Sequence, residues 1–142
     1  MGRRRQAREF ALQALYLVDV ANNPSGEAFA IVNRRADPPD EATLEFARTL
    51  LEGALQRLPE IDGHIAATAR NWPLKRMAAI DRCLLRLAAY ELAFERETPV
   101  SVVIDEAIEI ARKYSGEDST KFVNGILDKL KNLRDGPPPS PI

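Results

Sequence analysis

The most hydrophobic segment of the chain, residues 80–92, constrains the fold more than any other part of the sequence. Its apolar residues cover most of the circumference of a helix: Leu84, Leu85, Leu87, Ala88, Ala89 and Leu92. A helix that is apolar nearly all round must be surrounded by other elements, because an exposed face would leave those side chains in water. The segment therefore predicts a central, largely buried helix around which the rest of the chain packs.

Helical spacing dominates the rest of the sequence as well, and the alternation typical of strands is absent. The pattern predicts helices over about 3–20, a short stretch after Ser25, 40–58, 60–70, 98–115 and from about 118 onward. Ser25, Asp40 and Thr98 are predicted N-caps, and Pro99 fits the first position of its helix. We predict an all-α fold of six or seven helices, with residues 1–134 as one domain. The proline-rich residues 135–142 are predicted to be a disordered tail.

Composition restricts the class of protein. A single cysteine, Cys83, excludes an internal disulfide and suits a buried position in a protein of the reducing cytosol. No apolar stretch approaches the roughly 20 residues of a membrane span, and charged or polar residues interrupt the N-terminal segment where a signal peptide would need an apolar core. A cytoplasmic protein is expected.

Four arginines, Arg3, Arg4, Arg5 and Arg8, stand at the beginning of the first predicted helix. The N-terminal end of a helix is already positive, so cations there are unfavourable unless an anion balances them. Without these four, 16 basic residues face 21 acidic ones, and the rest of the chain carries a net charge of −5. A basic arm on an acidic body favours nucleic acid at one face and a basic protein at another; a solvated charge run is the alternative.

Catalytic chemistry has little support in the sequence. The only histidine, His64, has no nucleophile or metal-binding spacing beside it, and there is no glycine-rich phosphate loop. The acids of the segment after Pro99 are expected on the solvent face of its helix: Asp105, Glu106 and Glu109. We therefore predict no enzyme activity, no catalytic residues, no metal site and no cofactor.

Two polar features fit recognition or ordinary structure equally well. Tyr16 lies off the main apolar stripe, two turns beyond Arg8, where its ring either extends the arginine face by stacking on bases or closes the rim of the core. Glu117, Asp118 and Ser119 stand at the start of the last helix, where capping and an interface role cannot be told apart by pattern alone.

Four blocks of the sequence together resemble one family. They are residues 3–16 (RRRQAREFALQALY), 81–92 (DRCLLRLAAYEL), 99–109 (PVSVVIDEAIE) and 121–128 (KFVNGILD). In this order and spacing they are similar to the bacterial NusB family of transcription antitermination factors, over about residues 3–133.

The resemblance implies two packed three-helix bundles plus one further helix, and a role in ribosomal RNA transcription within the RNA polymerase antitermination complex. It implies binding of boxA-type single-stranded RNA together with the small-subunit ribosomal protein NusE, a partner whose usual basic charge would suit the acidic body. The RNA-binding candidates are Arg3, Arg4, Arg5, Arg8 and Lys121. The candidates for the protein partner are Tyr16, Asp81, Asp118 and Phe122.

Two other functions stay open at this point. The same fold occurs as the RNA-binding domain of rRNA cytosine methyltransferases, and a helical adaptor could use acidic faces for protein partners without any RNA. A homodimer that covers the arm is also compatible with the sequence.

Overall fold

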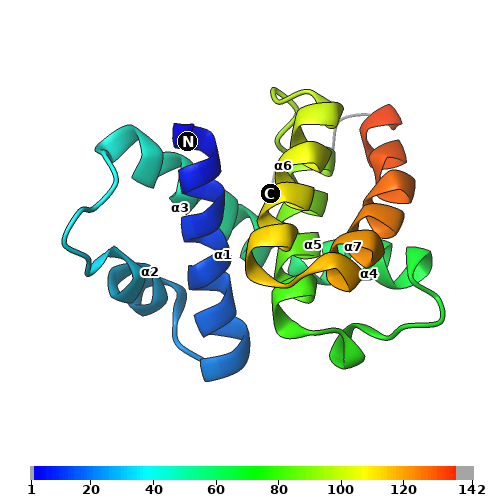
Figure 1. The fold of residues 1–142 in the computed structure, drawn as a ribbon, viewed down its shortest axis with the longest axis horizontal. Coiled ribbons are helices and arrows are strands. Elements are labelled where there is room, and N and C mark those ends of the chain that lie inside the picture. Colours follow the sequence, from blue (N-terminus) through cyan, green and yellow to red (C-terminus); the bar gives the residue numbers. More distant parts are fainter. Residues whose placement is uncertain (1, 137–142) are drawn as a thin grey trace.

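The computed structural model describes residues 2–136, and within them it contains α-helices and 3-10 turns but no strand (Figure 1). The elements are α1 (Arg3–Ala21), α2 (Ser25–Asn33), α3 (Glu41–Gln56), α4 (Leu58–Thr68), η1 (Leu74–Arg76), α5 (Ala79–Ala93), α6 (Val100–Tyr114), α7 (Glu117–Leu130) and η2 (Lys131–Asp135). The prediction of an all-α fold of six or seven helices is confirmed. None of these helices is long and apolar enough to cross a lipid bilayer.

The helices form two groups that lie side by side (Figure 1). One group is α1, α2 and α3, and the other is α4, α5, α6 and α7. Contacts between α1 and α5 and between α3 and α5 join the two groups into one core. This arrangement confirms the expected pair of sub-bundles, with the second one holding the additional helix.

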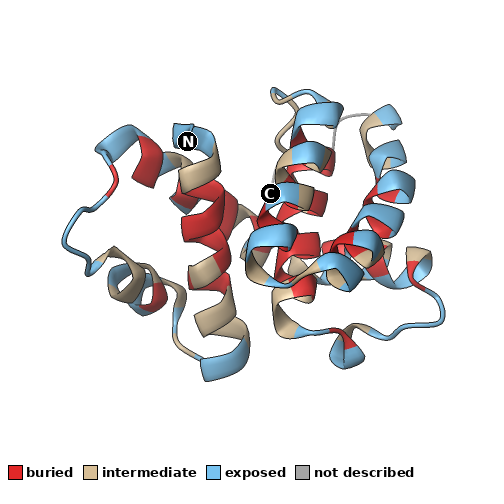
Figure 2. Ribbon diagram, in the orientation of Figure 1, coloured by how far each residue is buried: buried red, intermediate tan, exposed pale blue. Residues whose placement is uncertain are grey.

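The central helix predicted from residues 80–92 is α5. Leu85 and Leu92 are fully buried, as is Cys83, and buried positions follow one another along most of the helix (Figure 2). α5 packs against α1, α3, α4, α6 and α7. Its burial follows from composition, because only a helix with apolar side chains all round can occupy the middle of two bundles.

A polar cluster also crosses the boundary between the two groups. Asp19 near the end of α1 accepts hydrogen bonds from Arg82 (3.1 Å) and Arg86 (3.0 Å) of α5. Arg86 continues to Asp62 of α4 through a pair of bonds of 2.8 and 2.9 Å. These side chains are largely buried, so the ion pairs fix how α1, α4 and α5 meet as well as adding stability.

The predicted helix ends are correct in one case and displaced in two. Asp40 caps α3, accepting a 2.9 Å hydrogen bond from the backbone N–H of Thr43. Ser25 does not cap α2, because it is already the first helical residue and its side chain forms no cap bond. Pro99 is the N-cap of α6 rather than its first residue, so Thr98 lies one position too early.

The last described residues pack against the C-terminal end of α5. Arg134 of η2 donates to the carbonyl of Leu92 (2.7 Å) in the last turn of α5 and to that of Thr98 (2.9 Å) in the connection to α6. Asp135 belongs to η2, and Gly136 accepts a 2.9 Å bond from Arg96, so the first two residues assigned to a tail are held by the domain. The remainder of the predicted disordered tail, 137–142, lies outside the described residues.

Candidate nucleic-acid interface

The N-terminal end of α1 is exposed and positive. Its N-cap is Gly2, no side chain caps it, and the first turn contains no acidic residue, so the helix dipole adds to the charge of the arginines. The Arg3 side chain is 78% exposed and lies 3.4 Å from the carboxylate of Asp40. The exposed Arg4 places its guanidinium over the ring of Phe46, 3.7 Å from the ring centroid. Arg3 and Arg4 are therefore both available to an approaching anion.

The other two arginines turn inward. Arg8 is 6% exposed and Glu91 of α5 is 2% exposed. The Arg8 guanidinium donates two parallel hydrogen bonds of 2.8 and 2.9 Å to the Glu91 carboxylate. Arg5, which is half-buried, donates to Glu106 of α6 through Nε at 3.0 Å and through a second, shorter bond. Burial and a complete bidentate pair argue against the assignment of Arg8 to RNA contact.

Carboxylates from elsewhere in the fold balance the cations of α1. The hydrogen bond to Glu106 raises the pKa of Arg5. Burial alone would lower the pKa of Arg8, but the bonds to Glu91 and its charge outweigh this and raise it. The expectation that Glu106 faces solvent was wrong, because its side chain is largely enclosed between Arg5 and Arg8. The cations at the start of α1, unfavourable by sequence alone, are thus partly balanced by carboxylates inside the protein.

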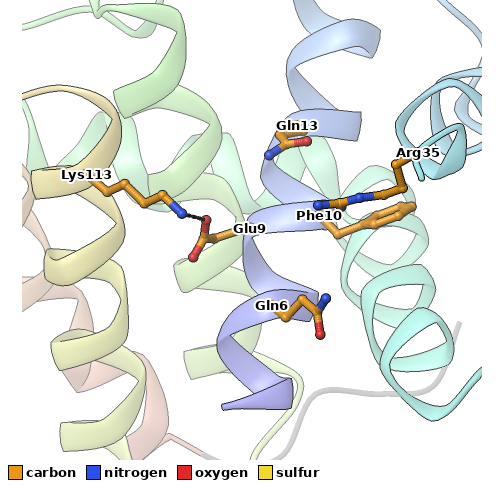
Figure 3. A pocket seen from close by; sticks show the side chains of 6 residues that line it. All are labelled: Gln6, Glu9, Phe10, Gln13, Arg35 and Lys113. Carbon is orange, nitrogen blue, oxygen red and sulfur yellow. Dashed lines mark hydrogen bonds and ion pairs between the residues drawn. The ribbon is translucent and has the colours of Figure 1, made fainter. Parts of the chain in front are cut away.

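A polar pocket of about 250 Å³ opens beside this helix end (Figure 3). Its lining residues are Gln6, Glu9, Phe10, Gln13, Arg35 and Lys113. Figure 3 shows Lys113 reaching from α6 to the buried Glu9, whose Oε1 accepts from Lys113 Nζ (2.6 Å) and Tyr114 Oη (2.9 Å). The other oxygen of Glu9 is buried without a hydrogen-bond partner. The hydrogen bond to Glu9 raises the pKa of Lys113, which keeps this cation charged.

Lys113 and Arg35 extend the basic surface beyond the first turn of α1, and sequence reasoning did not find either of them. Both are exposed, and they come from α6 and from the segment between α2 and α3. Nothing in the local sequence marks them, because only packing brings residues 35 and 113 next to residues 6–13.

The four residues expected to face a protein partner fall into two neighbourhoods. Tyr16 is half-buried in an apolar hollow whose lining includes Leu17, Ile80 and Tyr114. Asp81 follows Ile80 on α5, is buried, and accepts a 3.3 Å hydrogen bond from Ser115. This bond holds the α6–α7 connection against α5, so Asp81 has a structural partner inside the chain.

The second neighbourhood is on α7. Asp118 is exposed in the first turn of that helix, and Phe122 is half-buried with its ring edge-to-face against Trp72, the centroids 6.5 Å apart. Lys121 is exposed on the same helix, which lies on the far side of the molecule from the N-terminus (Figure 1). The structure therefore does not bring Lys121 together with the arginines of α1.

Within residues 2–136 no group of three or more histidine, cysteine or acidic side chains is arranged to hold a metal ion. Fold and surface together define a small all-α protein with a basic helix end, a polar pocket beside it, and the exposed Asp118 and half-buried Phe122 on α7. The chain belongs to the NusB family, which it matches over residues 5–132.

Similar proteins cover nearly the whole chain. It is 47% identical to the transcription antitermination protein NusB of Elusimicrobium minutum over 135 residues, which are 94% of this chain and 96% of that protein. It is 46% identical to the NusB protein of Symbiobacterium thermophilum, with 89% of this chain and 88% of that protein covered.

Solved structures agree with the fold. T. maritima NusB superposes with a TM-score of 0.83 at 38% identity, covering 91% of this chain and 90% of that chain. A chain in the crystal structure of the antitermination factors NusB and NusE in complex with dsRNA superposes with a TM-score of 0.84 at 28% identity, covering 92% and 96%.

Proposed function

We propose that this protein is a transcription antitermination factor that binds boxA-type RNA of nascent rRNA leaders together with the ribosomal protein NusE. Its role is recognition without catalysis, within the RNA polymerase antitermination complex and hence in the cytoplasm. The observation that carries this proposal is the exposed positive end of α1, where Arg3 and Arg4 stand on an uncapped helix in a chain of the NusB family.

The arginines divide the work in this proposal. Arg3 and Arg4 contact phosphates or stack on unpaired bases, because both are exposed and only loosely held. Arg5 and Arg8 hold α1 against α5 and α6, and so keep the end of the helix in place. The nearby Arg35 and Lys113 add positive potential along the same side.

NusE is proposed to bind the face that carries Tyr16, Asp118 and Phe122. Tyr16 borders an apolar hollow, and Phe122 and the exposed Asp118 lie one turn apart on α7, a combination that suits a basic protein with an apolar anchor. Asp81 contributes to this face indirectly, by holding Ser115 and the connection that leads into α7.

The proposal is tested by the affinity for a boxA RNA, single-stranded and as a duplex, with and without NusE, across a salt series. Replacing Arg3 and Arg4 by glutamine should weaken binding and lower the salt slope by about 1.4, since each phosphate contact to a single strand contributes about 0.7. The control is the double variant Arg34→Gln with Arg48→Gln, which removes two exposed charges outside the first turn of α1.

Equal losses of RNA affinity in the two double variants would show that α1 contributes only general positive charge. This result would count against the assignment of Arg3 and Arg4 to RNA contact. Binding of NusE but of no RNA by the unaltered protein would instead support a helical adaptor.

A further inference from the structure

Trp72 is the most exposed large apolar side chain among residues 2–136. It is 51% exposed, and it is the only tryptophan of the chain. Its ring lies beside that of Phe122, so the two form a small aromatic platform at the surface between α7 and the segment that follows α4. An indole left half in water gains little within the monomer, and in binding proteins such a ring often contacts a ligand.

The cations around this platform have no acidic partners. Five basic residues occupy the segment that carries Trp72 or the adjoining α7: Arg70, Lys75, Arg76, Lys121 and Lys129. All five are exposed, and among residues 2–136 none of them forms a salt bridge. The contrast with α1 is informative, because there Arg3, Arg5 and Arg8 are each paired with a carboxylate.

A groove adjoins the platform at Asn71, the residue before Trp72, and neither ring of the platform lines it. Its volume is about 410 Å³, and it is lined by Ala67, Thr68, Arg70, Asn71 and Lys129. On α7, Lys129 is seven residues beyond Phe122, which puts both side chains on one face of the helix. Gly125 lies between them on that face, is exposed, and would meet no atom within 4 Å if it carried a Cβ. The surface of α7 between the aromatic pair and Lys129 is therefore unobstructed at Gly125.

We propose that this groove and the adjoining aromatic pair together form a second RNA-binding site, which takes a single-stranded segment with one base stacked on Trp72 and the neighbouring phosphates at Arg70 and Lys129. Aromatic rings interleaved with cations are the usual means of binding single strands, since every base offers a face to stack on and every linkage a charge to neutralise. The charges decide between RNA and a protein: a basic partner such as a ribosomal protein would be repelled by five unpaired cations. Phe122 belongs both to this aromatic pair and to the face proposed for NusE, so it lies at the border of the two surfaces, and the acidic Asp118 one turn before it lies on the NusE side.

The site is separate from the arm. Figure 1 shows α7 and the segment after α4 on the opposite side of the molecule from the N-terminus. A strand that occupied both sites would have to pass around the protein, which a leader RNA can do and a short oligonucleotide cannot. The inference extends the proposed RNA-binding function but rests on its own residues, so the two can fail independently.

Trp72 itself supplies the assay, because its fluorescence is the only tryptophan signal. The full-length variant with Arg3→Gln and Arg4→Gln is titrated with an oligouridine of about eight nucleotides, a length within the range that one single-strand site covers. We expect quenching that saturates, and no quenching by an oligomer of the same length in which the residues are abasic. Replacing Arg70 and Lys129 by glutamine should weaken binding about tenfold, while the Arg34→Gln, Arg48→Gln pair should not.

Anisotropy of labelled RNA gives a readout that does not depend on the indole. Trp72→Ala should weaken binding about tenfold, the order expected for one stacked base, and Trp72→Phe should restore most of it. Val102→Ala, which trims another exposed apolar residue, is the matched control. Emission unchanged at saturating RNA, equal quenching by the abasic oligomer, or unchanged affinity of Trp72→Ala would overturn the proposal. An emission change caused by NusE alone would replace it with a protein-binding platform.

Discussion

The pairing of Arg8 with Glu91 yields the sharpest prediction. Replacing Arg8 by methionine keeps most of the side-chain volume but leaves the Glu91 carboxylate buried without its partner. Breaking a buried ion pair in this way costs about 3–5 kcal/mol of unfolding free energy. For a domain of this size that corresponds to a fall in Tm of about 10–15 °C.

The reverse change should cost less. In Glu91→Leu the Arg8 guanidinium still has Glu106, whose Oε1 lies 3.7 Å from Nη1, to balance part of its charge. When both changes are combined, no charge is left unpaired, and stability should return to within about 2 kcal/mol of the unaltered protein, since apolar replacements of buried pairs are often near neutral. The double-mutant cycle therefore predicts a large favourable coupling between the two positions.

Urea unfolding followed by circular dichroism measures the four corners of this cycle, and RNA affinity is measured on the same proteins. The reasoning is refuted if Arg8→Met changes the unfolding free energy by less than about 0.5 kcal/mol, the size of an ordinary surface substitution. It is refuted with particular force if that variant also loses as much RNA affinity as the Arg3→Gln, Arg4→Gln pair. Arg8 would then point outward to RNA and not inward to Glu91.

Three further predictions concern the core. Burial would raise the pKa of Asp19, but the hydrogen bonds and charges of its two arginine partners on α5 lower it below its ordinary 3.8. The stability that the ionised Asp19 adds is therefore present above that pH and lost as the pH falls below it. In an acid titration followed by circular dichroism, Asp19→Asn should lose less stability between about pH 5 and about pH 2 than the unaltered protein. Burial raises the pKa of the Cys83 thiol to about 12, so an aromatic disulfide reagent at neutral pH should react with it only after unfolding, and rapid labelling of the native protein would contradict this. A methyl group at Gly53 would overlap the ring of Tyr90, so Gly53→Ala should destabilise the protein by about 1–3 kcal/mol. A methyl group at Gly125 would meet open space, so Gly125→Ala should stabilise the protein by about 0.5–1 kcal/mol. The melting temperatures of the two variants should therefore shift in opposite directions.

The sequence by itself determined the fold class and the central position of α5. Helix periodicity is local, and a segment that is apolar on nearly every side, such as residues 80–92, has few positions in a bundle other than its centre. The cap at Asp40 and the burial of Cys83 were predictable for the same reason, because each depends on neighbours within a few residues along the chain. The expected cap at Ser25 was wrong because the helix begins one residue earlier than predicted, with Pro24 as its N-cap and Ser25 already inside it.

The site was only partly predictable. The sequence indicated a basic helix end and a family, and it gave the four arginines of that helix end the same predicted role in RNA binding. Only the tertiary structure distinguished them: it exposes Arg3 and Arg4, and it buries Arg8 against Glu91, 83 residues away in the chain. It likewise placed Lys113 beside Glu9 and left Trp72 open among unpaired cations. A cation's partner depends on which carboxylate packing brings within about 3–4 Å, and no periodicity in the sequence records a distance between segments so far apart.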